Sequence, residues 1–205
     1  MKMIPNIITR IRNIFYYQRI VLYGYDLGID HKFETKGECE LYSASLKDVR
    51  QLFHDDLNTD LKSIPWDVWQ DKISRDLWHG FVCKEGDAVV AQAFYSVEDV
   101  FFGGTKWVVL SMPENSAYGF KLYTRPDYRG KGLGQAITSF RLNNAKNNGI
   151  EKFYTVINSQ NKVSRHNEEK IGGYLVGSVF FIKCRFFNLA VVSPFILKEG
   201  FRIKE

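Results

Sequence analysis

The chain has 205 residues, of which 45% are hydrophobic, and a net charge of +5; this composition predicts one folded domain with a core and argues against a disordered chain. No stretch is long and apolar enough to span a bilayer, and no zinc-finger spacing or basic run with interleaved aromatics indicates a nucleic-acid partner. The three cysteines are far apart, which argues against a disulfide framework and favours a reducing, cytoplasmic setting. We place Cys184 in the core, and we find no cysteine and histidine cluster typical of a metal site.

Residues 1–36 are predicted to form an extension ahead of a main domain at 37–205. Apolar residues recur at helical spacing between two arginines: Ile4, Ile7, Ile8, Ile11 and Phe15, with Arg10 and Arg12. Such a basic amphipathic helix either docks on its own domain or a partner subunit, which we favour, or lies on an anionic membrane surface. The arginines also interrupt any signal-peptide pattern, so no secretory leader is expected. A strand is predicted over 19–27.

Between residues 40 and 112 the pattern predicts a strand, two helices and several further strands. The strand covers 40–43, and Ser45 with Asp48 forms a capping box for the first helix. The second helix follows Pro65. Strands over 80–83 and 88–97 are joined by a turn at 85–87 and form a hairpin. The segment 100–112 is apolar but broken by two glycines, so it is either a bent strand or another hairpin.

The centre of the chain predicts a strand, a glycine-rich turn and a helix. Alternating residues from Tyr118 to Thr124 indicate a strand that Pro126 ends. The turn contains Arg129, Lys131 and three glycines, and the helix starts at Leu133. The uncapped amides of its first turn, beside these two cations, suit an anion such as a diphosphate. A strand over 152–157, a short helix over 163–171 and aromatic-rich strands over 174–192 follow.

The spacing of the glycines narrows the choice of anion. The order of a Walker loop is absent, and a dinucleotide-binding fingerprint would need glycine where Gln135 stands. The run Arg-x-x-Gly-x-Gly does occur, as Arg129, Gly132 and Gly134. It resembles the acetyl-CoA-binding motif of the GNAT superfamily, the Gcn5-related N-acetyltransferases. The alternative is an ordinary glycine-rich turn with surface charges.

The resemblance extends to the order of elements over residues 37–205. It implies the GNAT fold, an α/β (α+β) arrangement with a central mixed, mostly antiparallel sheet and helices on both faces. It also implies that the two parallel central strands splay apart. The donor implied is acetyl-CoA, without a metal, and its diphosphate would bind the amides of the loop.

A second signature of the family follows the next strand, and it is matched in part. Asn161, Ser164, Lys170 and Gly172 match, whereas Glu168 stands at the place of the family's Tyr and Gly173 at that of its Phe. In the family the pantetheine arm fills the gap between the splayed strands. The resemblance therefore implies the following cofactor-binding residues: Leu122, Tyr123, Thr124, Arg129, Gly130, Lys131, Gly132, Leu133, Gly134, Gln135, Asn161 and Ser164. Asn161 and Ser164 have a plain alternative role as helix caps.

The implied reaction is direct attack of a primary amine on the acetyl thioester. The Tyr that usually protonates the departing thiolate is missing, and Glu168 is the candidate for this role if burial raises its pKa. His166, Tyr123 and Tyr174 are alternatives, and the thiolate also has the option of leaving unaided. Acids near strand ends on the amine side, none of them preferred as base, are Glu98, Asp99 and Glu114.

The leading hypothesis is thus an N-acetyltransferase for a small-molecule, amino-sugar or peptide amine. The alternative, which the missing Tyr favours, is a GNAT-shaped module that binds acyl-CoA without turnover. A third and weaker hypothesis makes residues 1–36 a membrane or self-association anchor.

Overall fold

The computed structural model of the protein describes residues 15–28, 39–54, 61–101, 109–184 and 188–204. The predicted N-terminal amphipathic helix lies outside these residues except for Phe15, which belongs to a strand and not to a helix. The side chain of Cys184 also lies outside them. Within this part of the chain, no helix combines the length and the apolar character needed to cross a membrane.

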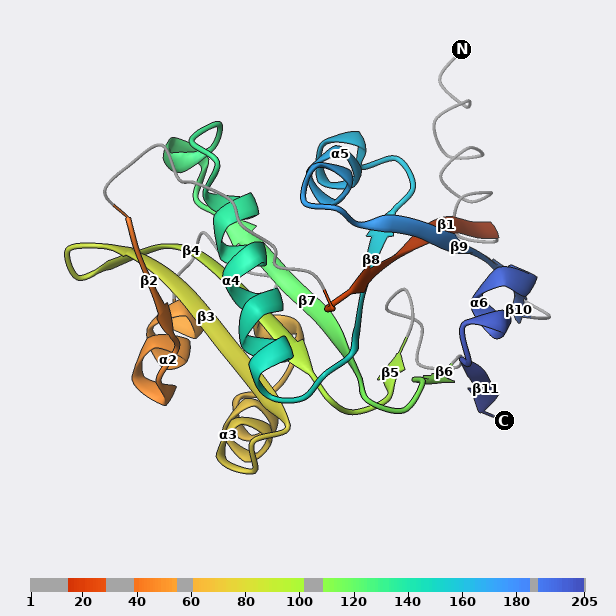
Figure 1. The fold of residues 1–205 in the computed structure, drawn as a ribbon, viewed down its shortest axis with the longest axis horizontal. Coiled ribbons are helices and arrows are strands. Elements are labelled where there is room, and N and C mark those ends of the chain that lie inside the picture. The colour runs from red at the N-terminus through yellow and green to blue at the C-terminus, as the bar shows by residue number, and fades with distance from the viewer. Residues whose placement is uncertain (1–14, 29–38, 55–60, 102–108, 185–187, 205) are drawn as a thin grey trace, which may run out of the picture.

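The main sheet has eight strands in the order β10-β9-β1-β8-β7-β4-β3-β2 (Figure 1). All neighbouring strands are antiparallel except β7 and β8, which are parallel. This mixed, mostly antiparallel sheet confirms the predicted fold. The strands are β1 Phe15–Asp26, β2 Glu40–Ser43, β3 Trp78–Glu85, β4 Ala88–Ser96, β7 Ser116–Thr124, β8 Lys152–Asn158, β9 Tyr174–Cys184 and β10 Asn188–Val192.

Helices cover both faces of this sheet. The buried side of α4 packs with Phe81, whereas α3 packs with Val82, and adjacent residues of a strand point to opposite faces. In Figure 1, α4 crosses the front of the sheet and α5 lies beside β1 and β9. The helices are α2 Leu46–His54, α3 Trp66–Ser74, α4 Leu133–Asn147, α5 Lys162–Lys170 and α6 Pro194–Lys198, with short 3-10 turns η1 Leu61–Ser63 and η3 Pro126–Tyr128.

Strand β1 lies inside the sheet, between β8 and β9. The strand predicted over 19–27 is confirmed and begins earlier, at Phe15. Its register places Ile20 opposite Asn158 of β8 and Val179 of β9. The main sheet therefore draws on residues from both sides of the boundary that the sequence predicts at residue 36.

Local sequence signals explain most of the other elements. Ser45 and Asp48 form the predicted capping box: the backbone N–H of each donates to the other's side chain, at 2.9 Å and 3.2 Å. Lys84 of β3 adds an ion pair to the Asp48 carboxylate at 2.7 Å. This box anchors the start of α2 beside the sheet.

The segment 100–112 is a hairpin, which was one of the two predicted alternatives. Its strands, β5 Val100–Phe101 and β6 Val109–Ser111, are antiparallel. They form a second, three-stranded sheet with β11 Arg202–Lys204. The sequence analysis predicted neither β11 nor α6.

Candidate functional site

Strands β7 and β8 separate part of the way along their length. Their parallel pairing ends at Gly119 and Thr155. Beyond this pair, which we call the apex, β7 continues along β4 and β8 continues along β1. The two strands diverge visibly in Figure 1. We call the resulting gap the β7–β8 opening. It is bordered by two strand edges whose backbone N–H and C=O groups no longer bond to each other.

A β-bulge accompanies the opening. The register between β4 and β7 shifts between Gln92 and Phe94, so that Phe94 pairs with Phe120 and Gln92 with Tyr123. Lys121 has a positive φ of 52° within this bulge. The alternation of side chains predicted a regular strand here, and we find no sequence signal for the bulge. It turns the end of β7 away from β8.

A cavity of about 1420 Å³ lies at the opening. It reaches residues on both faces of the sheet, since its lining includes Lys72 of α3 on one face and Arg141 of α4 on the other. The predicted site residues that line it are Leu122, Asn161, Ser164 and Glu168. The structure therefore brings together residues of β7 and α5 that the sequence separates by about forty positions.

The predicted anion loop lies at the end of β7, outside the lining of this cavity. Gly130 and Gly132 adopt positive φ values of 77° and 80°, which glycine reaches without strain. Gly132 is the N-cap of α4, and no side chain caps this helix. The Arg129 Nε donates to the carbonyl of Thr124 at 3.1 Å, which ties the loop to β7.

The remaining residues of the loop have contacts within the protein. The Lys131 ammonium lies 4.7 Å from the centre of the Tyr128 ring. The nearly buried Gln135 donates from its side chain to the Asn167 Oδ1 at 2.9 Å, which joins α4 to α5. Its backbone N–H donates to Gly132 at 3.1 Å. The side chain of Gln135 is therefore part of the scaffold of the site.

Asn161 is the N-cap of α5. Its Oδ1 accepts from the N–H of Ser164 at 3.1 Å. The capping role that the sequence left open is thus present, and both residues also line the cavity. One contact fixes the start of the helix that carries Glu168.

Glu168 is buried where α5 meets the floor of the cavity, and its side chain is 2% exposed. The hydroxyl of Tyr25 donates to its Oε2. Burial raises the pKa of Glu168, whereas the positive charge of Arg141 and the Tyr25 hydrogen bond work in the opposite direction. The net effect is a raised pKa, so the protonated carboxyl of Glu168 is favoured. Arg141 and Tyr25 stabilise the carboxylate when it forms.

Arg141 lies across from Glu168 and is 1% exposed. Its Nη1 donates to the carbonyl of Phe94 at 3.1 Å, and its Nε and Nη2 have no hydrogen-bond partner among the described residues. Burial lowers its pKa, and Glu168 works against this. Burial also raises the pKa of Tyr118, which lines the cavity too, to about 12.

Three residues of the site were not predicted from the sequence: Arg141, Tyr25 and Tyr118. Arg141 had a signal, because it stands four residues after Ile137 on the buried side of an amphipathic helix. A lone charge at such a position needs a partner or a function. Tyr25 had none, since it contacts a residue 143 positions away.

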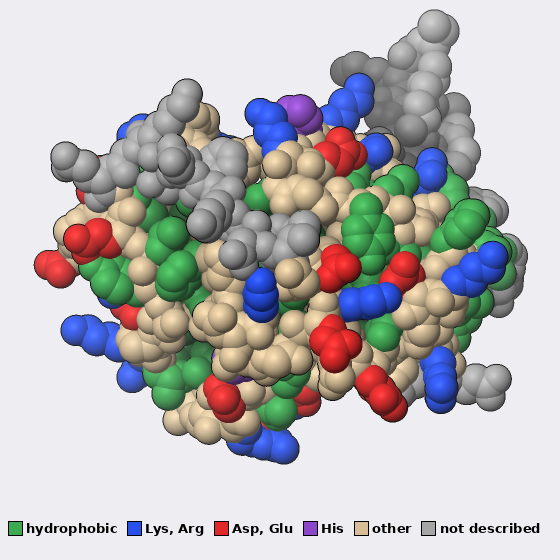
Figure 2. All heavy atoms as spheres, in the orientation of Figure 1, with side chains coloured by type: hydrophobic (Ala, Val, Ile, Leu, Met, Phe, Trp, Pro, Cys, Tyr) green, Lys and Arg blue, Asp and Glu red, His purple; other side chains and the backbone are tan. Residues whose placement is uncertain are grey.

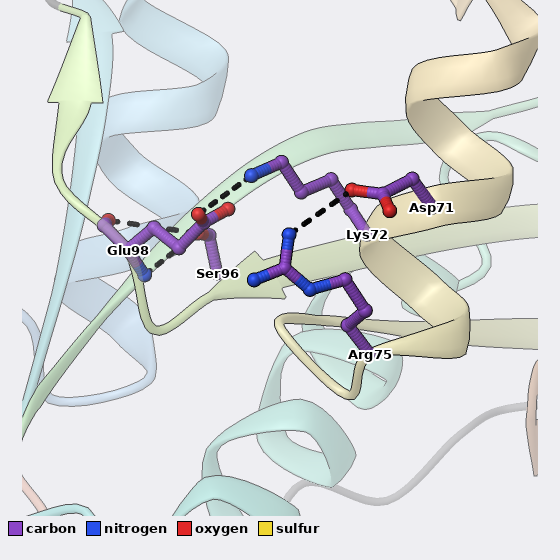
Figure 3. Close-up of polar contacts among 5 residues, drawn as sticks. All are labelled: Asp71, Lys72, Arg75, Ser96 and Glu98. Carbon is purple, nitrogen blue, oxygen red and sulfur yellow. Dashed lines mark hydrogen bonds and ion pairs between the residues drawn. The ribbon is translucent and has the colours of Figure 1, made fainter.

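The opposite end of the cavity combines apolar walls with acids. The apolar part is formed by Ile64, Val68, Trp78 and Val97. Glu98 and Asp99 line the same end, and Lys72 of α3 reaches across to Glu98 at 2.6 Å (Figure 3). The other candidate acids and bases predicted from the sequence do not belong to the lining: Glu114, Tyr123, His166 and Tyr174.

Figure 2 shows how charged side chains are distributed on one face of the molecule. Acidic and basic side chains are interspersed there, without a broad patch of one sign. Within the described ranges, no group of three or more histidine, cysteine or acidic side chains is placed to hold a metal ion.

Comparison with known proteins identifies the family. Residues 46–174 match the family model described as acetyltransferase (GNAT) family. No curated protein matches the chain. Solved structures that resemble it are a Drosophila protein (TM-score 0.60, 13% identity, covering 88% of this chain and 57% of that one) and a Sphaerobacter thermophilus GCN5-related N-acetyltransferase (0.58, 10%, 87% and 56%).

A third similar structure is a GCN5-related N-acetyltransferase from Kribbella flavida, with a TM-score of 0.57, 12% identity and coverage of 88% of this chain and 64% of that one. The chain thus spans less than two thirds of the length of each of these three proteins. At such identities the likeness shows the fold. The family model itself covers more than half of the 205 residues, from α2 to the start of β9. The chain belongs to the GNAT family of acetyltransferases.

Proposed function

We propose that the protein is an acetyl-CoA-dependent N-acetyltransferase that transfers the acetyl group to a primary amine by direct attack. The observation that carries this proposal is the β7–β8 opening, with a cavity that passes between the strands and is lined by Leu122, Asn161 and Ser164. An extended arm with alternating amides fits such a gap, because it can replace the missing strand on both edges.

The loop at the start of α4 is the proposed place of the diphosphate. Gly130 and Gly132 give the loop its left-handed turns, and the first turn of α4 is not capped by a side chain. Arg129 and Lys131 add positive charge at this end of the helix. Helix N-termini with these features bind phosphate groups. From here the arm would run along Leu122, Tyr123 and Thr124 toward the apex.

The reaction at the apex requires the thioester carbonyl to be polarised and the departing sulfur to be protonated. As the amine nitrogen attacks the thioester carbonyl, the C–S bond breaks and the sulfur leaves with the electron pair. We propose that a backbone N–H of β7 stabilises the oxyanion. Glu168 is the proposed acid for the sulfur, because it lines the cavity and its burial favours the protonated carboxyl.

The acceptor is proposed to enter from the end formed by Trp78, Val97 and Glu98. Its apolar walls suit the carbon skeleton of an amine, and the carboxylates of Glu98 and Asp99 attract its cationic nitrogen. Lys72 neutralises part of this charge through its ion pair with Glu98. The geometry therefore favours an amine attached to an apolar group over a highly charged polyamine.

Two measurements test the proposal in sequence. First, acetyl-CoA at 100 times its dissociation constant should stabilise the protein by about 2.7 kcal/mol, which corresponds to a Tm increase of about 5 to 10 °C for a chain of this size. Second, the release of CoA thiol from acetyl-CoA is measured with four amines: phenethylamine, in which the amine is attached to an apolar group, glucosamine, a peptide with a free N-terminus, and spermidine as the disfavoured polyamine. A Glu168→Gln variant serves as control, since it should bind acetyl-CoA normally but react slowly.

The outcomes separate the hypotheses. Stabilisation with thiol release that depends on an amine supports the transferase. Stabilisation without thiol release from any amine supports the binding module, and no heat shift at all removes both.

A further inference from the structure

We propose that Tyr25 of β1 is a positioning residue for acetyl transfer, and that its hydroxyl holds the Glu168 carboxyl in the orientation that protonates the departing sulfur. The inference rests on the proposed function and extends it to a strand that lies outside the segment matched by the family model, 46–174. The N-terminal strand would then complete the active site as well as the sheet.

The first support is the contact itself. Tyr25 and Glu168 are both buried, and the Tyr25 hydroxyl donates to the Glu168 Oε2. The Tyr25 ring packs edge-to-face on Phe153, its register partner on β8, with ring centres 6.3 Å apart. A ring fixed by β-sheet pairing and by packing has few alternative rotamers, so its hydroxyl restricts the carboxyl of Glu168.

The second support is the glycine at position 173. A Cβ atom there would lie 2.8 Å from the Cζ of Tyr25 and 2.9 Å from the carbonyl oxygen of Glu168. Any larger residue would therefore displace the Tyr25 ring. The two positions at which this chain departs from the GNAT pattern, Glu168 and Gly173, thus border the same tyrosine.

The third support is the charge around the carboxyl. The groups that face Glu168 are Tyr25 from β1 and Arg141 from α4. Burial raises the pKa of Tyr25 far above its usual range, so its hydroxyl keeps its proton and remains a donor. The carboxylate that forms when Glu168 gives up its proton is stabilised by this hydrogen bond and by the guanidinium of Arg141.

The proton balance of the proposed step is complete with water as the exchange partner. The C–N bond forms as the C–S bond breaks, and the sulfur takes the electron pair of that bond. The Glu168 carboxyl gives its proton to the sulfur and becomes a carboxylate. The cationic amine first gives one proton to water, and its nitrogen loses a second proton to water as the amide forms. A proton from water then restores Glu168, so one proton is released in each turnover. Tyr25 remains protonated throughout.

The test compares Tyr25→Phe with the matched variant Tyr23→Phe. Tyr23 lies two residues earlier on the same strand and also holds α5 by its hydroxyl, through Glu169 at 2.6 Å and Arg165 at 3.2 Å, but it does not touch Glu168. Both variants keep the ring and lose one hydroxyl together with its contacts to α5. A role in anchoring the helix would affect both, whereas a role in orienting Glu168 would affect Tyr25→Phe alone.

We expect Tyr25→Phe to lower kcat about tenfold, because misorienting Glu168 should remove part of the 10²- to 10⁴-fold that a general acid contributes. The KM for acetyl-CoA should stay within about twofold of wild type. Tyr23→Phe should stay close to wild type. Because the Tyr25 hydrogen bond lowers the pKa of Glu168, its loss should move the alkaline limb of the pH profile of kcat to higher pH. Glu168→Gln should abolish that limb, and adding Tyr25→Phe to it should cause no further loss.

The titration of Glu168 provides a readout without turnover. Its carboxyl carbon is followed by NMR in protein labelled at glutamate, and the signal is assigned by its loss in Glu168→Gln. A higher pKa in Tyr25→Phe but not in Tyr23→Phe supports the inference, and an unchanged pKa overturns it. If the wild-type protein is active and the two tyrosine variants have equal rates, the inference is refuted and the proposed function stands. If the wild-type protein releases no thiol with any amine, the proposed function is refuted as well.

Discussion

A single methyl group at Gly119 should destabilise the protein and disturb the apex of the β7–β8 opening. Gly119 belongs to the last pair of the parallel ladder. A Cβ atom there would lie 2.6 Å from the Phe153 ring, 2.8 Å from the Arg141 Nη1 and 2.9 Å from its Cζ. These distances are shorter than real Cβ contacts, so one neighbour has to move. Phe153 is fully buried, and Arg141, which lines the cavity, is held in place by its hydrogen bond to the Phe94 carbonyl.

The expected cost follows from overpacking. Forcing one extra methyl into a packed core costs about 1 to 3 kcal/mol. For a protein of this size, that corresponds to a fall in Tm of about 2 to 12 °C. The backbone of Gly119 is not in the left-handed region, so the penalty is steric only. Arg141 should be displaced from the carbonyl of Phe94 in the same variant.

The assay is urea denaturation of Gly119→Ala beside Gly134→Ala. A Cβ at Gly134 would meet only the Thr124 Oγ1, at an ordinary distance of 3.7 Å. In the first turn of α4, alanine should therefore raise the free energy of unfolding by about 0.4 to 1 kcal/mol. Both variants differ from wild type by one methyl group. The difference between their free energies of unfolding therefore measures the crowding at the apex.

Gly119→Ala as stable as wild type would refute this reasoning. A second check is Phe153→Leu, which removes the ring that the new methyl meets. If the crowding is real, the double variant should lose less stability than the sum of the two single variants. If the losses in stability of the two single variants are strictly additive in the double variant, the cost of Gly119→Ala does not come from contact with the Phe153 ring.

Three further outcomes are expected. Burial works to raise the pKa of Asp48, but hydrogen bonds from Lys84 and Ser45 lower it overall. The Asp48 carboxylate therefore adds to the free energy of unfolding at neutral pH, and this contribution is lost as pH falls through the lowered pKa. Asp48→Asn should thus cost about 1 kcal/mol at pH 7, and urea denaturation at pH 3 should show a smaller gap. Asn161→Asp should keep the α5 cap, whereas Asn161→Ala should lose about 1 kcal/mol; weaker acetyl-CoA binding by both, measured by calorimetry, would assign a ligand contact to the amide. Replacing Arg129 and Lys131 together by alanine should weaken acetyl-CoA binding and flatten its dependence on salt, and unchanged binding at low salt would contradict the proposed diphosphate site.

Local patterns predicted most elements of the fold. The capping box at Ser45, the hairpin at 85–87 and the glycine turn before α4 depend on residues within a few positions of one another. The helices over 46–54 and 133–147 likewise follow from apolar periodicity. Such features are encoded where they occur, and the structure confirms them.

Features that depend on distant contacts were not predictable in this way. The pattern of residues 19–27 indicates a strand but does not reveal its partners, which are more than 120 positions away in β8 and β9. The bulge at Lys121 lies within a regular alternation of side chains. The burial of Glu168 depends on Tyr25 and Arg141, which approach it from β1 and α4. The resemblance placed Glu168 in the site, and only the structure supplied its neighbours.

The position of β1 also has a consequence for how the chain folds. During synthesis this strand emerges before the other strands of the main sheet, yet both of its neighbours come from the last third of the 205 residues. Until they arrive, its apolar residues have no native partner, and pairings this far apart in sequence form slowly. A ribosome-bound chain that ends before β9 therefore exposes an open strand edge, and such edges invite aggregation. Refolding from denaturant should accordingly be slow, with the pairing of β1 among its latest events.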